Sequence, residues 1–244
     1  MQQNRSVQVA GGLMVGAAVL ANIGFNVLGS RFDYPDVLTE PAADVLTTFH
    51  ADAPTIGALF ATLAVASALL IPIAWLTRHL IAPGRTRQVM VAAGIAAGVV
   101  QVIGLLRWPL LVPRFADVAT DPTSTAAERA DAINLFETFH DLLGGLVGET
   151  LGYALTAVWT VAMVHGLRHR FGRWFAPAGI ASAALIATGL AEKVGVEAAG
   201  LTNFVGYIAW SLWIIATGVT FIRRPQATAA AAPLPARPAF AATG

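Results

Sequence analysis

The stretch that decides the fold is Leu142–Val164, LLGGLVGETLGYALTAVWTVAMV, which carries one formal charge, that of Glu149. At about 1.5 Å of helix rise per residue it covers the roughly 30 Å hydrocarbon core of a bilayer. Five other apolar runs of similar length occur along the chain, so the sequence predicts an all-α integral membrane bundle of six transmembrane helices. The predicted spans are residues 7–28, 54–77, 89–112, 142–164, 175–196 and 201–222.

Glu149 lies about 10 Å inside this span, measured from the first apolar residue at helical rise. An ionised carboxylate at that depth is costly unless it is paired, hydrogen-bonded or hydrated. Helical spacing puts Tyr153, Thr156 and Thr160 on the same face as Glu149. The fourth span is therefore predicted to have a polar face whose carboxylate must be compensated by a neighbour or by water.

A second face of the same span carries Gly144, Gly148 and Gly152, called here the glycine seam. Small residues at four-residue spacing let the backbone of another helix approach closely in a membrane. Gly12 and Gly16 repeat the spacing in the first span. The sequence therefore predicts close helix contacts at both places.

Polar groups gather in the outer halves of the spans when the six runs are placed in register. Arg107, at the end of the third span, is the predicted partner of Glu149, because a charged hydrogen-bonded pair lowers the burial cost of both groups. The candidate pocket residues are Glu149, Arg107, Tyr153, Asn26, Asn203 and Tyr207, and a secondary charge cluster consists of Glu192, Lys193 and Glu197.

Two interpretations of this polar layer stay open at the level of the sequence. In one, the groups line an outward-facing pocket that holds a cation, a proton or a small polar molecule. In the other, Arg107 and Glu149 form a structural clasp between the third and fourth spans, and the remaining groups meet lipid headgroups.

The composition supports the membrane class, since 56% of the residues are hydrophobic and 12% are charged. A soluble domain carries about twice that charged fraction. Evenly spread apolar runs indicate one six-span domain over residues 1–224, followed by an Ala/Pro-rich tail, 225–244, that is predicted to be disordered and cytoplasmic. The chain has no cysteine, which excludes disulfides, thiolate metal sites and cysteine nucleophiles.

The basic residues predict the orientation. Of the fifteen Lys and Arg residues, ten fall on one side of the predicted spans and three on the other. The positive-inside rule then places both termini in the cytoplasm, and the expected location is a plasma membrane. On the outer side, Thr125 and Glu128 match a capping box that starts an external amphipathic helix near Thr125–Asp141.

Several other site classes lack support in the sequence. His50 and His79 bracket the second span, but at helical rise they lie too far apart to face a haem within the hydrocarbon core. The sequence contains no phosphate-binding loop, no dinucleotide-binding glycine pattern and no HEXXH zinc motif. We therefore expect no cofactor, no metal site and no nucleic-acid partner.

Short motifs connect the chain with a known family. They are Phe139-His140, GGLVGETLGY at 144–153 followed by Trp159, and NFVGY at 203–207 followed by Trp213. In these motifs the chain resembles a bacterial membrane family known as domain of unknown function 4386, over roughly Val7 to Ile222. The resemblance implies a multi-span bacterial membrane protein, and it carries no established activity and no functional residues.

Three function hypotheses follow from these features. The first is a small transporter or channel-like protein with an outward-facing polar pocket around Glu149, and with a cation, a proton or a small polar molecule as its partner besides the lipid bilayer. The second is a non-catalytic membrane binding or sensor module that reads an external ligand through the acidic loops. The third is a membrane redox protein. The residues favour a role other than that of an enzyme, and they predict no particular oligomer.

Overall fold

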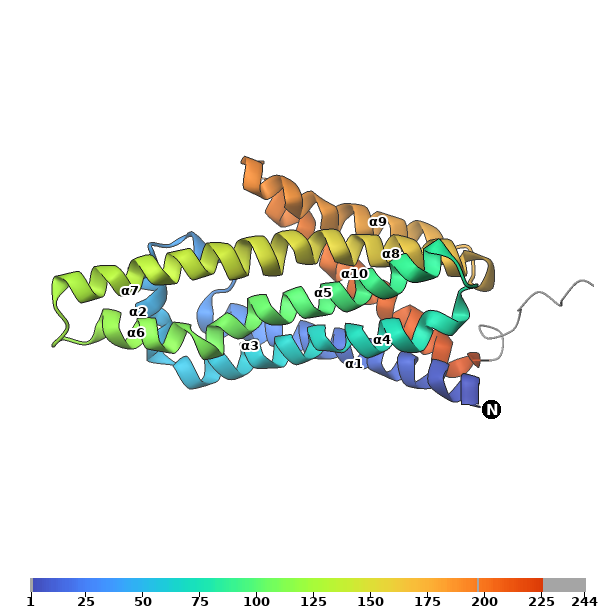
Figure 1. Ribbon diagram of the computed structural model, residues 1–244, viewed down its shortest axis with the longest axis horizontal. Coiled ribbons are helices and arrows are strands. Elements are labelled where there is room, and N and C mark those ends of the chain that lie inside the picture. Colours follow the sequence, from blue (N-terminus) through green and yellow to red (C-terminus); the bar gives the residue numbers. More distant parts are fainter. Residues whose placement is uncertain (1, 197, 226–244) are drawn as a thin grey trace, which may run out of the picture.

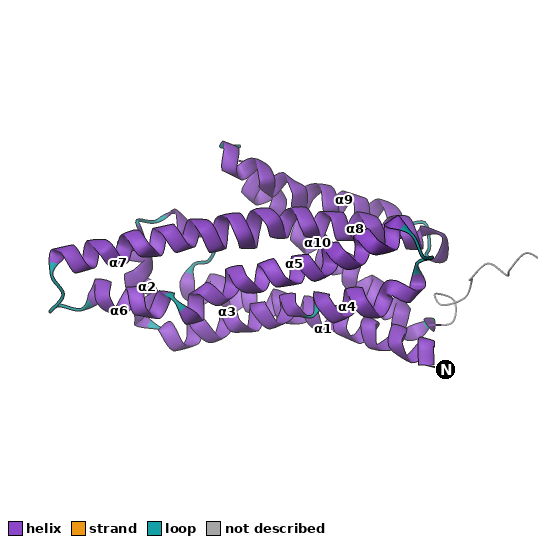
Figure 2. Cartoon of the chain, viewed as in Figure 1, coloured by secondary structure: helices purple, strands orange, loops and turns teal. Residues whose placement is uncertain are grey.

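The computed structural model describes residues 2–196 and 198–225, and within that part of the chain all regular structure is helical. Short turns join the helices (Figure 2). The element η3 is a π-helix, with hydrogen bonds from residue i to i+5, and the other η elements are short 3₁₀ helices. In chain order the elements are α1 (Gln2–Phe32), η1 (Asp36–Thr39), α2 (Ala42–Ala51), α3 (Ala53–Ala68), α4 (Leu70–Thr77), η2 (Arg78–Leu80), α5 (Arg85–Leu110), α6 (Val112–Thr120), α7 (Ala126–Phe139), η3 (His140–Leu151), α8 (Gly152–Leu167), η4 (Arg168–Arg170), α9 (Phe175–Ala187), η5 (Thr188–Val194) and α10 (Ala198–Arg223).

Six helical segments of the described chain are long and apolar enough to cross a membrane, which confirms the predicted membrane bundle. Each contains all or most of one predicted span. The segments are Asn4–Phe32, Ala53–Leu80, Arg85–Thr120, Ala126–Arg170, Phe175–Glu192 and Ala198–Arg223.

The contacts between the six spans arrange them one after another around a ring. The second span, α3 with α4, packs against α1 and α5, and α8 packs against α5 and α9. The last span, α10, packs against α9 and returns to α1, which closes the ring. Side chains of α8 and α10 also meet across the interior, where the ring of Trp159 lies 6.1 Å from that of Trp210 and 6.4 Å from that of Trp213.

Beyond one end of the ring, α2, α6 and α7 pack together as an extra layer, called here the cap (Figure 1). A contact of 3.2 Å between His50 Nδ1 and Asp117 Oδ1 joins α2 to α6 within it. Both ends of the described chain lie at the opposite end of the bundle, together with the arginine-rich turns η2 and η4. The positive-inside rule predicts that this terminal end faces the cytoplasm, and the cap the outside.

The predicted external helix exists and begins where expected. Thr125 Oγ1 accepts a hydrogen bond of 3.2 Å from the backbone N–H of Glu128, and Glu128 Oε2 accepts one of 2.8 Å from the backbone N–H of Thr125. This helix does not lie apart on the surface, because α7, η3 and α8 form one continuous rod (Figure 1). No proline or non-helical residue interrupts the chain between Phe139 and Gly152, so the helix continues into the fourth span.

Two segments that looked like loops in the sequence are helical. Proline marks both starts: Pro41 directly precedes α2, and Pro113 lies in the first turn of α6. Proline is well accepted there because the first backbone N–H groups of a helix have no partner within the helix. The cap is built largely from these two short helices and α7.

Two apolar cores fill the bundle. The core at the terminal end is centred on Trp159, Trp213 and Phe175. The core at the cap end surrounds Trp108 and Phe60 and continues between the cap helices. Most of the polar side chains discussed below lie between these cores or at the base of the cap.

The predicted glycine contacts are partly confirmed. Gly104 of α5 and Gly148 of the glycine seam meet backbone to backbone, since a Cβ atom on Gly104 would lie 2.6 Å from the Cα of Gly148. The expected contact at Gly12 and Gly16 is wrong, because both face open space. The neighbouring Gly11 makes it instead, against Gly218 of α10. Residue spacing alone did not identify which face of α1 meets α10.

Candidate functional site

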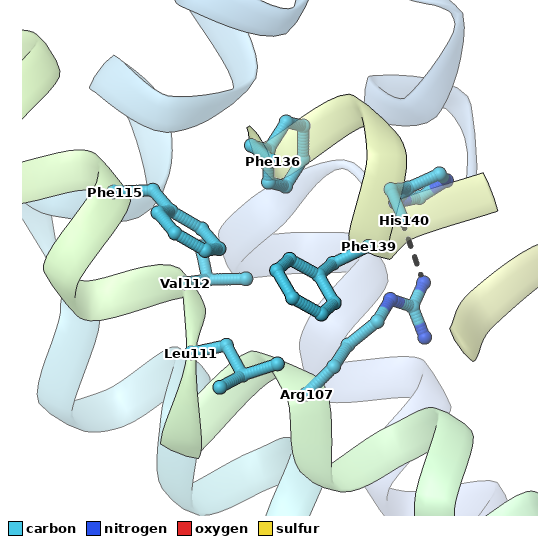
Figure 3. Close-up of a pocket in the computed structure, with 7 residues that line it drawn as sticks. All are labelled: Arg107, Leu111, Val112, Phe115, Phe136, Phe139 and His140. Carbon is cyan, nitrogen blue, oxygen red and sulfur yellow. Dashed lines mark hydrogen bonds between the residues drawn. The ribbon is translucent and has the colours of Figure 1, made fainter. Parts of the chain in front are cut away.

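Arg107 lies near the cap end of α5 and is only 5% exposed. Its Nη1 donates a hydrogen bond of 2.6 Å to the carbonyl of Gly104, one turn back on the same helix. Its Nη2 lies 3.4 Å from Nδ1 of His140, the first residue of η3 (Figure 3). A charged side chain at the base of the cap is thus held by a carbonyl and an imidazole.

The glycine seam makes room for the polar side chains of α5. A Cβ atom on Gly144 would lie 2.5 Å from the Cζ of Arg107, and one on Gly152 would lie 3.0 Å from the Cγ of Gln101. Between them, Gly148 meets the backbone of α5 at Gly104. The seam therefore does more than bring two helices together, because it also leaves space for a guanidinium and an amide beside the fourth span.

The contacts of Arg107 differ from the predicted clasp. In the part of the chain that the structure describes, no carboxylate oxygen lies within 4.0 Å of its guanidinium, and Glu149 acts on it electrostatically over a longer distance. Gly144 lies opposite Arg107, and Glu149 follows five residues later in the π-helix η3.

All three tyrosines of the chain gather around Glu149. Tyr34 comes from the loop after α1, Tyr153 from α8 and Tyr207 from α10, and each phenol lies within electrostatic reach of the Glu149 carboxylate. The rings of Tyr153 and Tyr207 are 5.8 Å apart. Glu192 of η5 also acts on Tyr34 and Tyr153. One carboxylate thus acts electrostatically on phenols from three separate parts of the fold.

A hydrogen-bonded row of side chains continues from this cluster into the ring. Gln101 Nε2 donates a bond of 2.9 Å to Thr156 Oγ1, and the Thr156 side chain is also hydrogen-bonded to Tyr207. Further down, Trp210 Nε1 donates to Thr160 Oγ1 over 2.8 Å. These bonds connect α5, α8 and α10 through polar atoms, so hydrogen-bonded side chains run beside the apolar core over about one turn of α8.

A family model described as a domain of unknown function, DUF4386, matches residues 9–218, which is most of the chain. The chain belongs to the DUF4386 family. No curated protein and no solved structure matches this DUF4386 chain. The family description names no activity, so the function must be inferred from the geometry of the site.

The structure places the other predicted site residues of this DUF4386 chain in different surroundings. Asn203 is buried and donates a hydrogen bond of 2.6 Å to the carbonyl of Ile186, which joins α10 to α9. Asn26 is exposed on α1. Glu192 is exposed in η5, whereas the Lys193 side chain and Glu197 lie outside the described residues. Of the predicted set, Glu149, Tyr153, Tyr207 and Arg107 form the polar cluster.

Two members of the cluster were missed from the sequence. Tyr34 lies in a connecting segment without periodicity, and only the fold brings it back to the bundle. There the aromatic rings of Tyr34 and Phe60 lie 5.3 Å apart. Gln101 lies in the middle of an apolar run and could have been flagged as an uncharged polar residue inside the third span. In the described residues, no group of three or more His, Asp or Glu side chains is arranged to hold a metal ion.

Tyr34 provides a solution test of this DUF4386 cluster. Burial, and then the negative charge of Glu149, raise the pKa of Tyr34 to about 12 from the ordinary 10.0, while Arg107 acts in the opposite direction. We expect Glu149→Gln to lower that pKa, because a neutral amide no longer disfavours the phenolate. A phenolate absorbance titration, corrected with Tyr34→Phe, measures the shift.

The control for this titration is Glu137→Gln, which removes an exposed charge on α7 and should leave the Tyr34 titration in place. Because the folded pKa lies above the unfolded one, Tyr34 also contributes stability that is present below about pH 10 and lost toward pH 12. An unchanged Tyr34 titration in Glu149→Gln would contradict the proximity of the two groups.

Proposed function

We propose that this protein is a small membrane transporter that takes a cation or a proton at Glu149. The observation that carries the proposal is the convergence of Tyr34, Tyr153 and Tyr207 on this one carboxylate, from three separate elements. A carboxylate provides the charge that a cation needs inside an apolar bundle, and phenol oxygens and ring faces provide further attraction.

The local backbone supports the same proposal. Glu149 lies in the π-helix η3, and Thr150 Oγ1 donates a hydrogen bond of 2.8 Å to the carbonyl of Gly145, five residues back. π-helical turns occur frequently at functional sites, where they change the direction of side chains. Here the turn lies between the cap and the polar row of α8.

The test is a flux measurement in sealed proteoliposomes that contain the full chain. We expect Glu149→Gln to lower proton or monovalent cation flux at least about tenfold, because the variant keeps the shape of the side chain and loses its charge. Glu137→Gln on the surface of α7 is the matched control and should keep full flux. A correctly folded Glu149→Gln protein with full flux would refute the proposal.

A binding or sensor module is the second candidate, and the cap is the observation that favours it. The helices α2, α6 and α7 form a packed layer beyond the ring, which a simple pore does not need. This candidate predicts saturable binding of a cation that depends on Glu149 without any flux, so the same proteoliposomes distinguish the two functions.

A further inference from the structure

The guanidinium of Arg107 is a buried positive charge without a matching anion in direct contact. The side chain is 5% exposed, and its Nε has no hydrogen-bond partner among the described residues. Its two other nitrogens meet the carbonyl of Gly104 and the imidazole of His140, neither of which carries a negative charge. Buried charges in proteins are usually paired, because an unpaired charge loses its hydration without replacement.

Arg107 and His140 line one side of a small pocket at the base of the cap (Figure 3). Its remaining lining is apolar and consists of Leu111, Val112, Phe115, Phe136 and Phe139. The pocket thus combines a cation and a hydrogen-bonding ring on one side with aromatic and aliphatic walls on the other. That combination fits a molecule with an anionic group at one end and an apolar body.

The pocket is closed in this structure, since it is too narrow to admit a water molecule. Its wall toward the cap consists of side chains, not of backbone. The rings of Phe115 and Phe139 are stacked, with centroids 5.9 Å apart and an angle of 15° between the planes. Phe139 is only half-buried. Rotation of this one side chain would therefore open the pocket without moving a helix.

His140 adds a proton-dependent component. Arginine only donates hydrogen bonds, so the Nδ1 atom of His140 accepts from Arg107 and the imidazole is neutral in this arrangement. A protonated His140 would place a second positive charge beside the guanidinium. The two charges repel each other when no anion is bound, and both attract an anion that lies between them.

Other charged groups surround this pair at greater distance. Glu149 and Tyr34 act electrostatically on Arg107, and Glu192 of η5 acts on Tyr34. Within the cap, α2 and α6 contribute His50 and Asp117, which contact each other and are exposed. Besides Glu149, the charged groups on the same rod as His140 are Glu128, Asp131, Glu137 and Asp141, which are exposed, and Arg129, which is partly buried.

We propose that this pocket binds a small carboxylate with an apolar body, with the carboxylate on Arg107 and one proton taken up by His140. The anion supplies the missing counter-charge, and the aromatic walls receive the apolar body. The proton comes from water, no covalent bond forms or breaks, and the protonated Nδ1 donates to the carboxylate instead of accepting from Arg107. This site adjoins the proposed cation site at Glu149, whose carboxylate acts on Arg107 only over a longer distance.

The experiment titrates the purified full chain with benzoate, which stays ionised throughout, at pH 6 to 8. The fluorescence of Trp108, whose ring lies 6.2 Å from that of His140, reports binding. Because one proton is taken up, we expect the dissociation constant to rise about tenfold per pH unit above the ordinary titration range of imidazole. Benzamide, which has the same shape without the charge, should not bind.

Variants separate the contributions. Arg107→Gln should abolish benzoate binding. His140→Gln should keep binding and lose the pH dependence, so it remains informative even if Arg107→Gln does not fold. His50→Gln, in the cap but outside the pocket, should behave like the wild type. Glu149→Gln should retain benzoate binding, which keeps a failure of this proposal distinguishable from a failure of the proposed transport.

The source of the ligand is decided by comparing benzoate with a fatty acid supplied in vesicles. If the fatty acid binds more tightly, with the same dependence on Arg107 and pH, the proposal is supported with the bilayer as the source of the ligand. If benzoate binds more tightly, the proposal is supported with an aqueous source. No binding of either carboxylate, equal binding of benzamide, or wild-type affinity in a folded Arg107→Gln variant would overturn the proposal.

Discussion

Gly104→Val is expected to prevent the chain from reaching its folded state. A Cβ atom at this position would lie 2.6 Å from the Cα of Gly148 and 3.0 Å from the carbonyl oxygen of Leu143. Both are backbone atoms, which cannot rotate away as the end of a side chain can. The substitution must therefore push α5 and η3 apart. We expect the free energy of unfolding to fall by at least about 3 kcal/mol, which is the upper end of the usual cost of overpacking.

The measurement is the yield and the thermal unfolding of detergent-purified protein, followed by size exclusion and tryptophan fluorescence. Gly12→Val is the matched control, because nothing lies within 4 Å of a Cβ atom at that position. It should unfold at the wild-type temperature. If Gly104→Val were as stable as Gly12→Val, the close approach of α5 and η3 would be wrong, and with it the space that the glycine seam leaves for Arg107.

Trp108→Ala is expected to have the second largest effect. The indole is fully buried in the core at the cap end, where it stacks on Phe60 at 4.6 Å and meets the edges of Phe32 and Phe136 at 5.2 and 6.1 Å. Removing it leaves a cavity that rigid aromatic neighbours cannot fill. Substitutions of this kind lower the free energy of unfolding by about 3–5 kcal/mol.

Trp75→Ala is the control for this experiment, since Trp75 is 52% exposed and packs mainly against the guanidinium of Arg78. Denaturation monitored by circular dichroism should show a large decrease in stability for Trp108→Ala and a small decrease for Trp75→Ala. Equal effects of the two substitutions would mean that the aromatic core is not the main support of the cap. Trp108→Ala should also disturb Arg107 and His140, which lie beside the indole.

The features that depend on local pattern were predictable. The six spans follow from apolar length alone, the start of α7 from the capping box at Thr125, and the close approach of Gly148 from four-residue spacing. Each of these depends on neighbouring residues in the chain. The membrane class and the continuity of the spans therefore needed no tertiary information.

The features that depend on register or on long-range folding were not predictable. Arg107 was assigned to Glu149 because both charges lie in the outer halves of their spans, whereas its guanidinium contacts His140 and the carbonyl of Gly104. His140, the residue that Arg107 contacts, stood out in the sequence only as part of the motif Phe139-His140. Tyr34 joins the cluster through the path of the loop after α1. The sequence thus identified Glu149 and Arg107 as the charged residues of the site, but it did not identify the residues that contact Arg107.

The uninterrupted helix from Ala126 to Arg170 has a mechanical consequence. With 45 residues it is about 67 Å long at standard rise, more than twice the thickness of the hydrocarbon core. A stiff lever of that length converts a small tilt of its exposed tip into a proportionate displacement of the turn that carries Glu149. The cap helix α7 and the turn that carries Glu149 are thus parts of one helical segment, with no loop between them.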